Sequence, residues 1–391
     1  MSALQINHSN DLKRLRDEGY HLEISDGHLF VHHIPYVNSK CDIKFGVLVT
    51  TLNISGNSTA KPNTHVMMFS GEDPCDKGGV IISGIKHSNI NKTFTNGIIV
   101  TRQFSNKPKE GYSDYYEKVR NYSNIISAPA KYLDDSISEM PFLPVINIDE
   151  SSVFNYYDTN GSRANIEQIN RKLSEQKIAI IGMGGTGAYI LDLIAKTHVA
   201  EIHIYDGDIF LNHNAFRSPG AASIDILNKR PNKAIYYKGI YEAMRKNIYE
   251  HSYYLFFENF VELDNMDYVF ICIDDNEVRA QLVRYLIEKQ ISFIDVGLGV
   301  NTVDDKLIGT IRVTTVTEDK NDHVDRRIPQ TNNLNNEYET NIQIAELNNL
   351  NAVYAVMKWK KLSNFYQDLE NECHSTYSIN NSFLNNEETR A

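Results

Sequence analysis

The sequence predicts an α/β protein in which a mostly parallel β-sheet follows a separate, β-rich α+β amino-terminal domain. Three observations support this fold class. A chain of 391 residues exceeds one small core and suggests two or three domains. Up to about residue 150, short β-branched runs alternate with Gly, Asn, Asp and Ser turns. From about residue 160, strand patterns alternate with helical patterns, which is typical of βαβ units.

Residues 1–150 form the predicted β-rich domain, whose role is unknown. The segment DLKRLRDEGY at 11–20 predicts a helix that ends at a glycine, and YSDYYEKVRNYSNII at 112–126 predicts an amphipathic helix. Strands are expected within residues 28–34, 42–54, 65–69, 79–85 and 93–104. Residues 130–160 are richer in proline and acids, so we expect a linker there.

Residues 151–375 form the predicted α/β domain, and residues 376–391 form a carboxyl-terminal tail that we expect to fray. A helix is expected at 341–362, whereas the charged, Asn-rich stretch 317–340 predicts a long loop. Strands are expected within residues 177–182, 201–206, 253–257, 268–273 and 292–297, with 308–316 as a later antiparallel addition.

Composition argues against several classes of protein. A net charge of -11 disfavours nucleic acid as the main partner, because phosphate neutralisation needs a basic surface. The four cysteines form no C-x-x-C pair, so neither a disulfide framework nor a thiolate zinc site is indicated, and we expect a cytoplasmic protein. The sequence shows no signal-peptide core and no apolar run of bilayer length, so we expect neither secretion nor membrane insertion.

The segment GMGGTG, which begins at Gly182, stands between a predicted strand and a predicted helix. Gly182 permits a tight turn, and Gly184 and Gly185 let backbone amides approach a phosphate, with Thr186 in the same turn. Gly187 lets the helix pack against the strand. The pattern indicates a nucleotide site on a Rossmann-like sheet, although a glycine turn without a ligand has the same residues.

Polar residues follow the next predicted strand. Asp206 ends that strand at the spacing where a carboxylate reaches ribose hydroxyls. The stretch DGDIFLNHNAFRS then adds Asp208, Asn214 and Arg217 beside the carboxyl end of the sheet. A dinucleotide dehydrogenase needs only one carboxylate there, so the additional polar residues favour a different nucleotide.

Two cations and a strand-end acid suit a triphosphate with magnesium. Arg217 and Lys233 would neutralise charge on the phosphates, and Asp274 would hold Mg²⁺ through a carboxylate oxygen. These residues predict ATP and Mg²⁺ as cofactors. Lys233 lies in a charged patch that a solvated surface also explains, and the adjacent Asp275 is an alternative metal ligand.

These motifs, in this order, resemble the ThiF/MoeB/ubiquitin-activating superfamily of adenylating enzymes. The chain carries the family's G-x-G-G-x-G, its D-x-D with a following Asn and Arg, its lysine, and its strand-end D-N-x-x-x-R. In the last motif Asp275 stands where Asn is commoner, and Arg279 completes the pattern. The resemblance covers about residues 160–360. Within the superfamily, the chain more closely resembles bacterial ThiF-domain proteins that carry an uncharacterised amino-terminal domain.

The resemblance implies an ATP-dependent adenylyltransferase that activates the carboxyl terminus of a ubiquitin-like or sulfur-carrier protein and releases pyrophosphate. It also implies a homodimer in which an arginine reaches the partner's phosphates. Arg163 is the candidate for that arginine, and Arg171 is the second choice. The loop at 317–340 would cover the carrier tail, and a conjugating enzyme is a further candidate partner.

Alternatives remain open at this point. A catalytically silent scaffold would keep the fold and bind the carrier, and a nicotinamide or flavin oxidoreductase would use the same glycine turn. A thioester step would need an activated cysteine, for which Cys373 beside His374 is one candidate. A second site around Cys75, with His65 and Glu72, is the remaining alternative to a structural loop.

Overall fold

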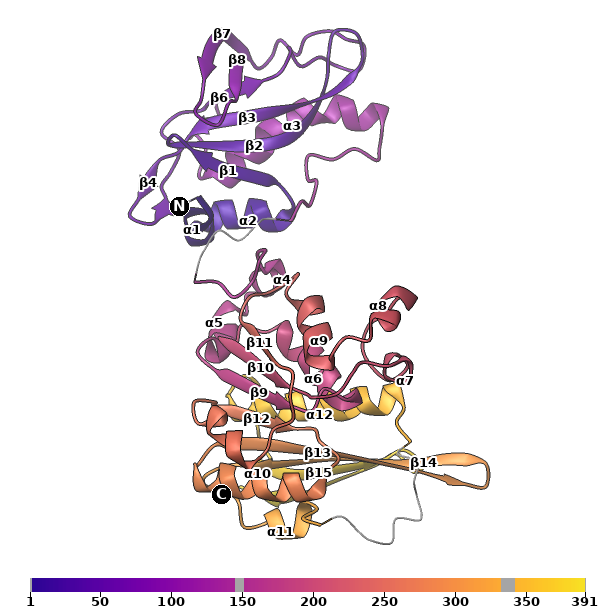
Figure 1. The fold of residues 1–391 in the computed structure, drawn as a ribbon. Helices are drawn as coiled ribbons and strands as arrows, with labels where there is room; N and C mark the ends of the chain where they lie inside the picture. The colour runs from indigo at the N-terminus through magenta and orange to yellow at the C-terminus, as the bar shows by residue number, and fades with distance from the viewer. Residues whose placement is uncertain (1, 145–150, 332–341, 391) are drawn as a thin grey trace. The chain divides into compact units, whose positions relative to one another are not determined.

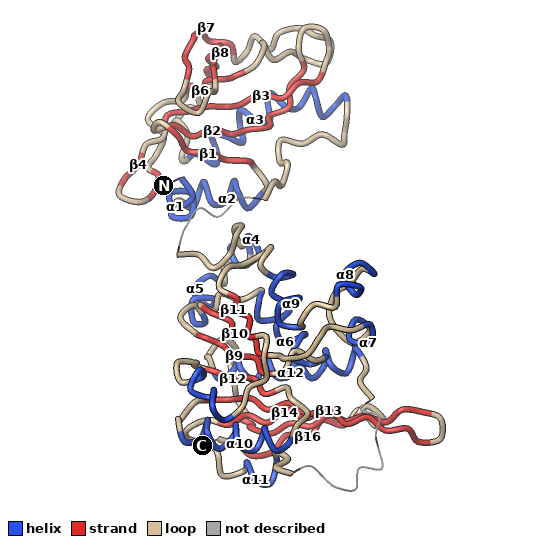
Figure 2. The backbone as a smooth tube through the Cα atoms, viewed as in Figure 1, coloured by secondary structure: helices blue, strands red, loops and turns tan. Residues whose placement is uncertain are grey.

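The computed structural model describes residues 2–144, 151–331 and 342–390. The chain divides into two compact units (Figures 1 and 2). The amino-terminal unit comprises Met1–Ser151 with Tyr156–Arg163, and the carboxyl-terminal unit comprises Ser152–Asn155 with Ala164–Ala391. Each unit has hydrophobic core residues of its own.

The amino-terminal unit is built on a six-stranded antiparallel sheet in the order β1-β2-β3-β6-β8-β7, which confirms the predicted β-rich α+β fold. The strands are β1 (His21–Ser25), β2 (His28–Val37), β3 (Ile43–Thr51), β6 (Val66–Ser70), β7 (Lys86–Thr93) and β8 (Ile99–Ser105), and a small hairpin pairs β4 (Ile54–Ser55) with β5 (Ser58–Thr59). The helices are α1 (Ser2–His8), α2 (Asn10–Glu18), α3 (Tyr115–Leu133) and α4 (Thr159–Arg163). Helix α3 buries Tyr115 and Tyr122 in the core, as its amphipathic pattern predicts.

The strand predictions for this unit differ from the structure chiefly at residues 79–85, at β7 and at β1, which was not expected as a strand. The stretch 79–85 is not a strand, and within it only Ile81 makes an isolated bridge, to Cys75. Val80 is 65% exposed, so the apolar residues of this stretch do not mark a core strand. The edge strand β7 was not expected, because its KHSNINKT sequence is polar and mostly exposed.

Lys118 is a fully buried cation inside the amino-terminal unit. Its Nζ donates to Thr50 Oγ1 at 2.7 Å and to the carbonyl of Thr64 at 2.8 Å. Burial lowers the pKa of Lys118 to about 7, because an ammonium removed from water loses its hydration. Folding therefore opposes protonation of this side chain near neutral pH.

We expect this shift to make the free energy of unfolding depend on pH. Between about pH 7 and pH 10 the unfolded chain binds more protons at Lys118 than the folded chain, so this contribution to stability rises with pH, by at most about 1.4 kcal/mol per unit. Urea unfolding of the wild type and of Lys118→Met at pH 7 and pH 9 checks this. The free energy of unfolding of the wild type should rise relative to that of Lys118→Met from pH 7 to pH 9. An equal difference between the two proteins at both pH values would contradict the shifted pKa of Lys118.

The carboxyl-terminal unit is built on an eight-stranded sheet in the order β11-β10-β9-β12-β13-β14-β15-β16. The first five strands in this order are parallel and the last three join antiparallel, which confirms the predicted mostly parallel sheet. The strands are β9 (Lys177–Ile181), β10 (Glu201–Tyr205), β11 (Ile248–His251), β12 (Tyr268–Ile271), β13 (Ser292–Val303), β14 (Lys306–Val316), β15 (Glu372–Ser378) and β16 (Phe383–Thr389). The β13–β14 hairpin extends beyond the other strands (Figure 2).

Helices cover both faces of this sheet. Ile178 and Ile180 of β9 belong to the core that includes residues of α6 (Gly185–Ala195), α9 (Lys233–Tyr241) and α12 (Ala345–Leu362). Ala179 and Ile181 belong to the core that includes residues of α10 (Asn276–Glu288). This alternation follows from the period of two along a strand, and a strand apolar on both faces is typical of a parallel sheet. The shorter helices are α5 (Glu167–Asn170), η1 (Arg171–Leu173), α7 (Asn212–Ala215), α8 (Ile224–Lys229), η2 (Phe257–Leu263) and α11 (Val324–Arg327).

The strand predicted at 253–257 is wrong. The edge strand is β11, which pairs with β10 a few residues earlier, and its YEH residues after Ile248 are only partly buried or exposed. Most of the aromatic residues that suggested a strand lie in the following loop, where Tyr254 is 54% exposed, and Phe257 begins η2. These aromatic residues therefore form part of an exposed surface and not a strand of the sheet.

The expectation that the chain frays after residue 375 is also wrong for residues 376–389. These residues complete β15 and form β16, which pair in register from Glu372 opposite Thr389 to Ser378 opposite Phe383. Within the predicted 317–340 loop the structure contains the short helix α11, and residues 332–340 lie outside the described residues. None of the described helices is both long and apolar enough to cross a membrane.

Candidate nucleotide site

A cleft of about 900 Å³ opens where β9, β10 and β12 reach their carboxyl ends, beside residues 296–299 of β13. The predicted residues that line it are Gly182, Gly184, Gly185, Thr186, Asp206, Asp208, Arg217, Lys233 and Asp274. These residues come from five separate stretches of sequence. Parallel strands with right-handed crossovers bring their carboxyl ends to one edge, where ligands of such sheets bind.

At two points of the glycine turn a side chain would collide with backbone. Gly182 adopts a φ of +90°, and a Cβ there would lie 2.7 Å from the carbonyl oxygen of Cys272. A Cβ on Gly187 would lie 1.9 Å from the carbonyl oxygen of Gly182, so close helix packing requires glycine. Gly184, by contrast, has open space beside it. The amino terminus of α6 therefore faces the cleft with unobstructed backbone, as an anion site requires.

The carboxylate of Asp206 holds the glycine turn in place through hydrogen bonds to the backbone. One of its carboxylate oxygens accepts from the backbone N–H of Met183 at 2.7 Å, and the other accepts from the N–H of Asp208 at 2.8 Å. Asp206 is buried, and this burial raises its pKa although Lys233 opposes the shift. The carboxylate thus organises the turn, and each oxygen retains a second acceptor site for a ligand hydroxyl.

Lys233 lies at the floor of the cleft between the two acids. Its Nζ is 2.7 Å from Asp208 and 3.7 Å from Asp206, and only about 7% of its side chain is exposed. Asp208 is half-exposed and also accepts a hydrogen bond from Tyr254, whose ring covers Gly207. Burial raises the pKa of Asp208, but Lys233 and Tyr254 hold it below its ordinary value. Lys233 is therefore a buried cation and not part of a solvated charge run.

Arg217 brings a second cation to the cleft. Its Nε is buried and has no hydrogen-bond partner among the described residues. Burial lowers the pKa of Arg217, and the negative charge of Asp274 partly offsets this. Asn214 does not line the cleft, because its side-chain oxygen accepts from the N–H of Leu211 at 2.8 Å and closes the α7 turn that carries Arg217. A buried donor without an acceptor is suited to an anion.

The two neighbouring acids after β12 have different surroundings. Asp275 caps α10, and one of its oxygens accepts from the N–H of Glu277 at 2.9 Å and of Val278 at 3.2 Å. Asp274 is exposed and lines the cleft in the field of Arg217. The carboxylate of Asp274 thus fits a magnesium ion, which prefers oxygen ligands together with substrate phosphates.

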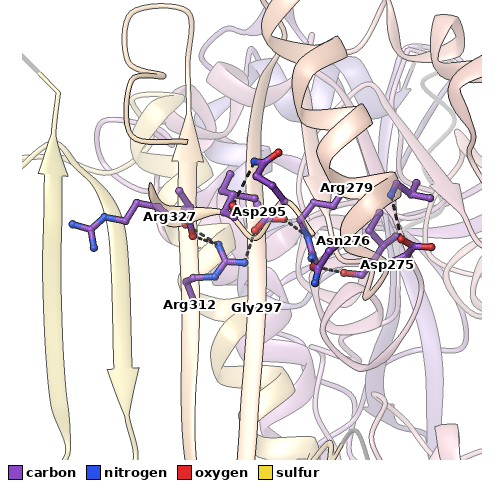
Figure 3. A network of polar contacts seen from close by, with 12 residues as sticks. Asp275, Asn276, Arg279, Asp295, Gly297, Arg312 and Arg327 are labelled. Atoms are coloured by element: carbon purple, nitrogen blue, oxygen red, sulfur yellow. Dashed lines mark hydrogen bonds and ion pairs between the residues drawn. The ribbon is translucent and has the colours of Figure 1, made fainter. Parts of the chain in front are cut away.

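A buried ionic triad beside the cleft was not expected from the sequence (Figure 3). Asp295 on β13 is fully buried, and its two carboxylate oxygens lie 3.0 Å from Arg279 Nε and 2.5 Å from Arg312 Nη2. An acid inside the apolar strand SFIDVG was the available signal, because a buried carboxylate needs a cationic partner. Three further residues that line the cleft were not expected from the sequence: Tyr254, Asn348 and Asn351.

The cysteines of the described residues do not form an activated thiol in this unit. Cys272 and Cys373 are desolvated by burial, which raises the pKa of each thiol. His374 does not assist Cys373, since its Nδ1 contacts Thr314 Oγ1 at 3.0 Å and its pKa is lowered to about 4 by burial. Cys75, in the amino-terminal unit, is buried as well and its pKa is raised.

We therefore expect Cys373→Ala to leave any activity of the cleft unchanged within about twofold, because a buried neutral thiol is not a nucleophile. The variant should lose on the order of 1 kcal/mol of stability through the small cavity it creates. ATP turnover and thermal unfolding check both statements. A loss of turnover by a well-folded Cys373→Ala protein would show that the thiol takes part in the reaction.

The two arginines proposed to act across a dimer lie outside the cleft lining. Arg163 is the last residue of α4 in the amino-terminal unit, and Arg171 begins η1 in the carboxyl-terminal unit. Neither is among the described residues that line the cleft. The dimer contact predicted for Arg163 stays a prediction.

Comparisons with known proteins add the following findings. A family model described as "ThiF family" matches residues 159–357, and one described as "Domain of unknown function (DUF6791)" matches residues 10–159. No curated protein matches.

Solved structures that resemble the chain include E. coli MccB with succinimide, at 18% identity and a TM-score of 0.46 over 60% of this chain and 72% of that chain. The microcin C7 biosynthetic enzyme MccB with N-formylated MccA has 16% identity and a TM-score of 0.46, over 78% and 97%. PaaA has 17% identity and a TM-score of 0.45, over 59% and 80%.

Proposed function

Because the chain belongs to the ThiF family through residues 159–357, we propose that it is an ATP-dependent adenylyltransferase. Its substrate under this proposal is the carboxyl-terminal carboxylate of a ubiquitin-like or sulfur-carrier protein. The products are an acyl adenylate on that carboxylate and pyrophosphate.

One observation supports this proposal above the others. The cleft combines an open helix amino terminus, the buried and unpartnered Nε of Arg217, and the carboxylate of Asp274. The first two bind anionic oxygens, and the third binds a hard cation. Together they fit a triphosphate with its magnesium ion better than the single pyrophosphate of a dinucleotide.

In the proposed reaction these residues have the following roles. A carboxylate oxygen of the partner attacks the α-phosphorus of ATP, and the bond from that phosphorus to the bridging oxygen of the β-phosphate breaks. Arg217 and Lys233 offset the negative charge that gathers on the phosphate oxygens. Asp274 would hold Mg²⁺, which when bound neutralises the leaving pyrophosphate. Asp206 and Asp208 would accept from the ribose hydroxyls.

The shape of the cleft supports an extended partner segment. β12 ends at Ile271, opposite Asp295, whereas β13 continues to Val303. Gly297, Leu298 and Gly299 then line the cleft. An extended carboxyl-terminal tail can lie along such an exposed strand and present its end to the phosphates.

We propose a homodimer as the working state, with Arg163 as the arginine contributed across it.

The test is carrier-dependent exchange of labelled pyrophosphate into ATP. Purified protein should catalyse exchange when it receives a ubiquitin-like or sulfur-carrier protein with a free carboxyl terminus. The same carrier with an amidated terminus should be inactive, because it lacks the attacking carboxylate. Binding of active carriers without exchange would indicate a silent scaffold, and a tightly bound nicotinamide or flavin would indicate an oxidoreductase.

A further inference from the structure

The carboxylate of Asp295 connects three elements that are distant in the sequence. It lies on β13 and contacts Arg279 of α10 and Arg312 of β14. Replacement of a buried ion pair by apolar residues is often neutral or stabilising, so a buried triad is weak support for a purely stabilising role. Its two arginines line the cleft, which points to a role in the site.

The Arg279 end of the triad holds the loop that carries Asp274. Arg279 donates through Nη2 to the carbonyl of Ile273 and through Nη1 to the side-chain oxygen of Asn276 (Figure 3). Its two donors therefore hold the backbone before Asp274 and the side chain of a residue after it. The position of the proposed metal ligand is set by this guanidinium.

The Arg312 end holds a different part of the cleft wall. Its Nη1 donates to the carbonyl of Arg327 at 3.2 Å and to Thr314 Oγ1 at 2.9 Å. The same segment is reached from the other side, because Asn276 Nδ2 donates to the carbonyl of Thr331 at 3.2 Å. The contacts close a ring that runs from residues 327–331 through the triad to the Asp274 loop and back. Pro329, inside that segment, lines the cleft.

We propose that Arg279, Asp295 and Arg312 are positioning residues that couple the seating of residues 327–331 to the placement of Asp274. When residues 327–331 occupy the position described above, Arg312 and Asn276 each have a carbonyl acceptor in this segment, and Asp274 faces the phosphates. When the segment moves, Arg312 and Asn276 each lose an acceptor and the loop is released. A partner tail that contacts the wall at Pro329 would thereby favour the arrangement of Asp274 that holds Mg²⁺. This step rests on the proposed function, whereas the coupling itself does not.

The coupling is tested first without nucleotide, by hydrogen exchange. Asp295→Asn should accelerate amide exchange by about tenfold in both 273–279 and 327–331, and leave α6 unchanged. The matched control is Glu372→Gln. Glu372 is also a buried carboxylate between two cations, Lys358 and Lys361, but neither of these lysines lines the cleft, unlike Arg279 and Arg312. Equal exchange in the two variants at both segments would overturn the proposal.

A second variant addresses the case in which Asp295→Asn unfolds the whole unit. Arg312→Lys keeps a cation for Asp295 but cannot also reach the carbonyl of Arg327. It should accelerate exchange at 327–331 and, through the ring, at 273–279. Acceleration at 327–331 alone would show that the two segments are independent and would overturn the coupling.

The functional readout is the magnesium dependence of ATP binding and exchange. Both variants should raise the Mg²⁺ concentration needed for half-maximal ATP binding by about 10-fold to 100-fold, with ATP binding in EDTA unchanged. The kcat for exchange should fall more than KM for the carrier rises. If Asp274→Asn also leaves the magnesium dependence unchanged, the metal role of Asp274 fails; if only Asp274→Asn alters it, the positioning role fails. Absence of carrier-dependent exchange by the wild type would instead contradict the proposed function.

Discussion

Replacing Asp274 by Asn is expected to lower carrier-dependent pyrophosphate exchange by about 10²-fold to 10³-fold, with the thermal unfolding midpoint nearly unchanged. Asp274 is exposed at the cleft and does not cap a helix, so little of the fold depends on its charge. The asparagine keeps the shape but removes the anionic oxygen that a magnesium ion prefers. Initial exchange rates at saturating ATP, measured over a range of Mg²⁺ concentrations, check this.

The neighbouring acid provides the control. Asp275→Ala removes the cap of α10 and should cost about 0.5–2 kcal/mol of stability while retaining most of the exchange activity. The opposite result, with Asp275→Ala inactive and Asp274→Asn active, would transfer the metal role to Asp275. Equal activity of both variants with the wild type would remove metal binding from this loop.

Replacing Lys233 by Met is expected to destabilise the fold strongly. The substitution leaves Asp206 buried without its nearest cation, and breaking such a pair costs about 3–5 kcal/mol. The half-exposed Asp208 also loses Lys233, at a smaller cost because water reaches it. Urea unfolding measures the loss, and ATP binding should be lost as well.

The loss should depend on pH in a defined direction. Burial already raises the pKa of Asp206, and removal of Lys233 raises it further. A carboxyl whose pKa is higher in the folded state contributes stability below its unfolded value and loses it as pH rises through the folded value. Lys233→Met should thus be closer to the wild type at pH 5 than at pH 8. An equal deficit at both pH values would show that Asp206 does not carry the cost.

Lys238→Met on the same helix is the matched control. Lys238 pairs with Glu250 at 2.5 Å, but both side chains are about one third exposed. A pair of this kind contributes about 0–1 kcal/mol. A deficit as large as that of Lys233→Met would mean that the loss of a lysine from α9, and not the buried acids, destabilises the fold.

The central sheet could be predicted because its signals are local. β9, β12 and β13 begin in runs that are apolar on both faces, β10 alternates Ile202 and Ile204 with polar residues, and the glycine turn is determined by the four glycines of GMGGTG. The same logic places Arg217, Lys233 and Asp274 together, since residues after parallel strands meet at one edge of the sheet.

The remainder depends on contacts that no local pattern encodes. The YYLFF stretch has the composition of a strand, yet the edge strand of the sheet is the more polar β11. The edge strand is determined by pairing with β10 and not by composition. The partners of Asp295 lie on α10 and β14, and neither spacing nor composition identifies them. The pairing of β15 with β14 likewise joins residues that are far apart in the chain.

The floor of the cleft also has a consequence for biosynthesis. A Cβ on Gly185 would lie 2.1 Å from the amide nitrogen of Asn348, and Thr186 Oγ1 donates to the same side chain at 3.0 Å, across 162 residues of sequence. The glycine turn therefore gains its contact with Asn348 only when α12 has left the ribosome. A nascent chain that already contains every glycine of the motif should remain unable to retain ATP until α12 (Ala345–Leu362) has been translated.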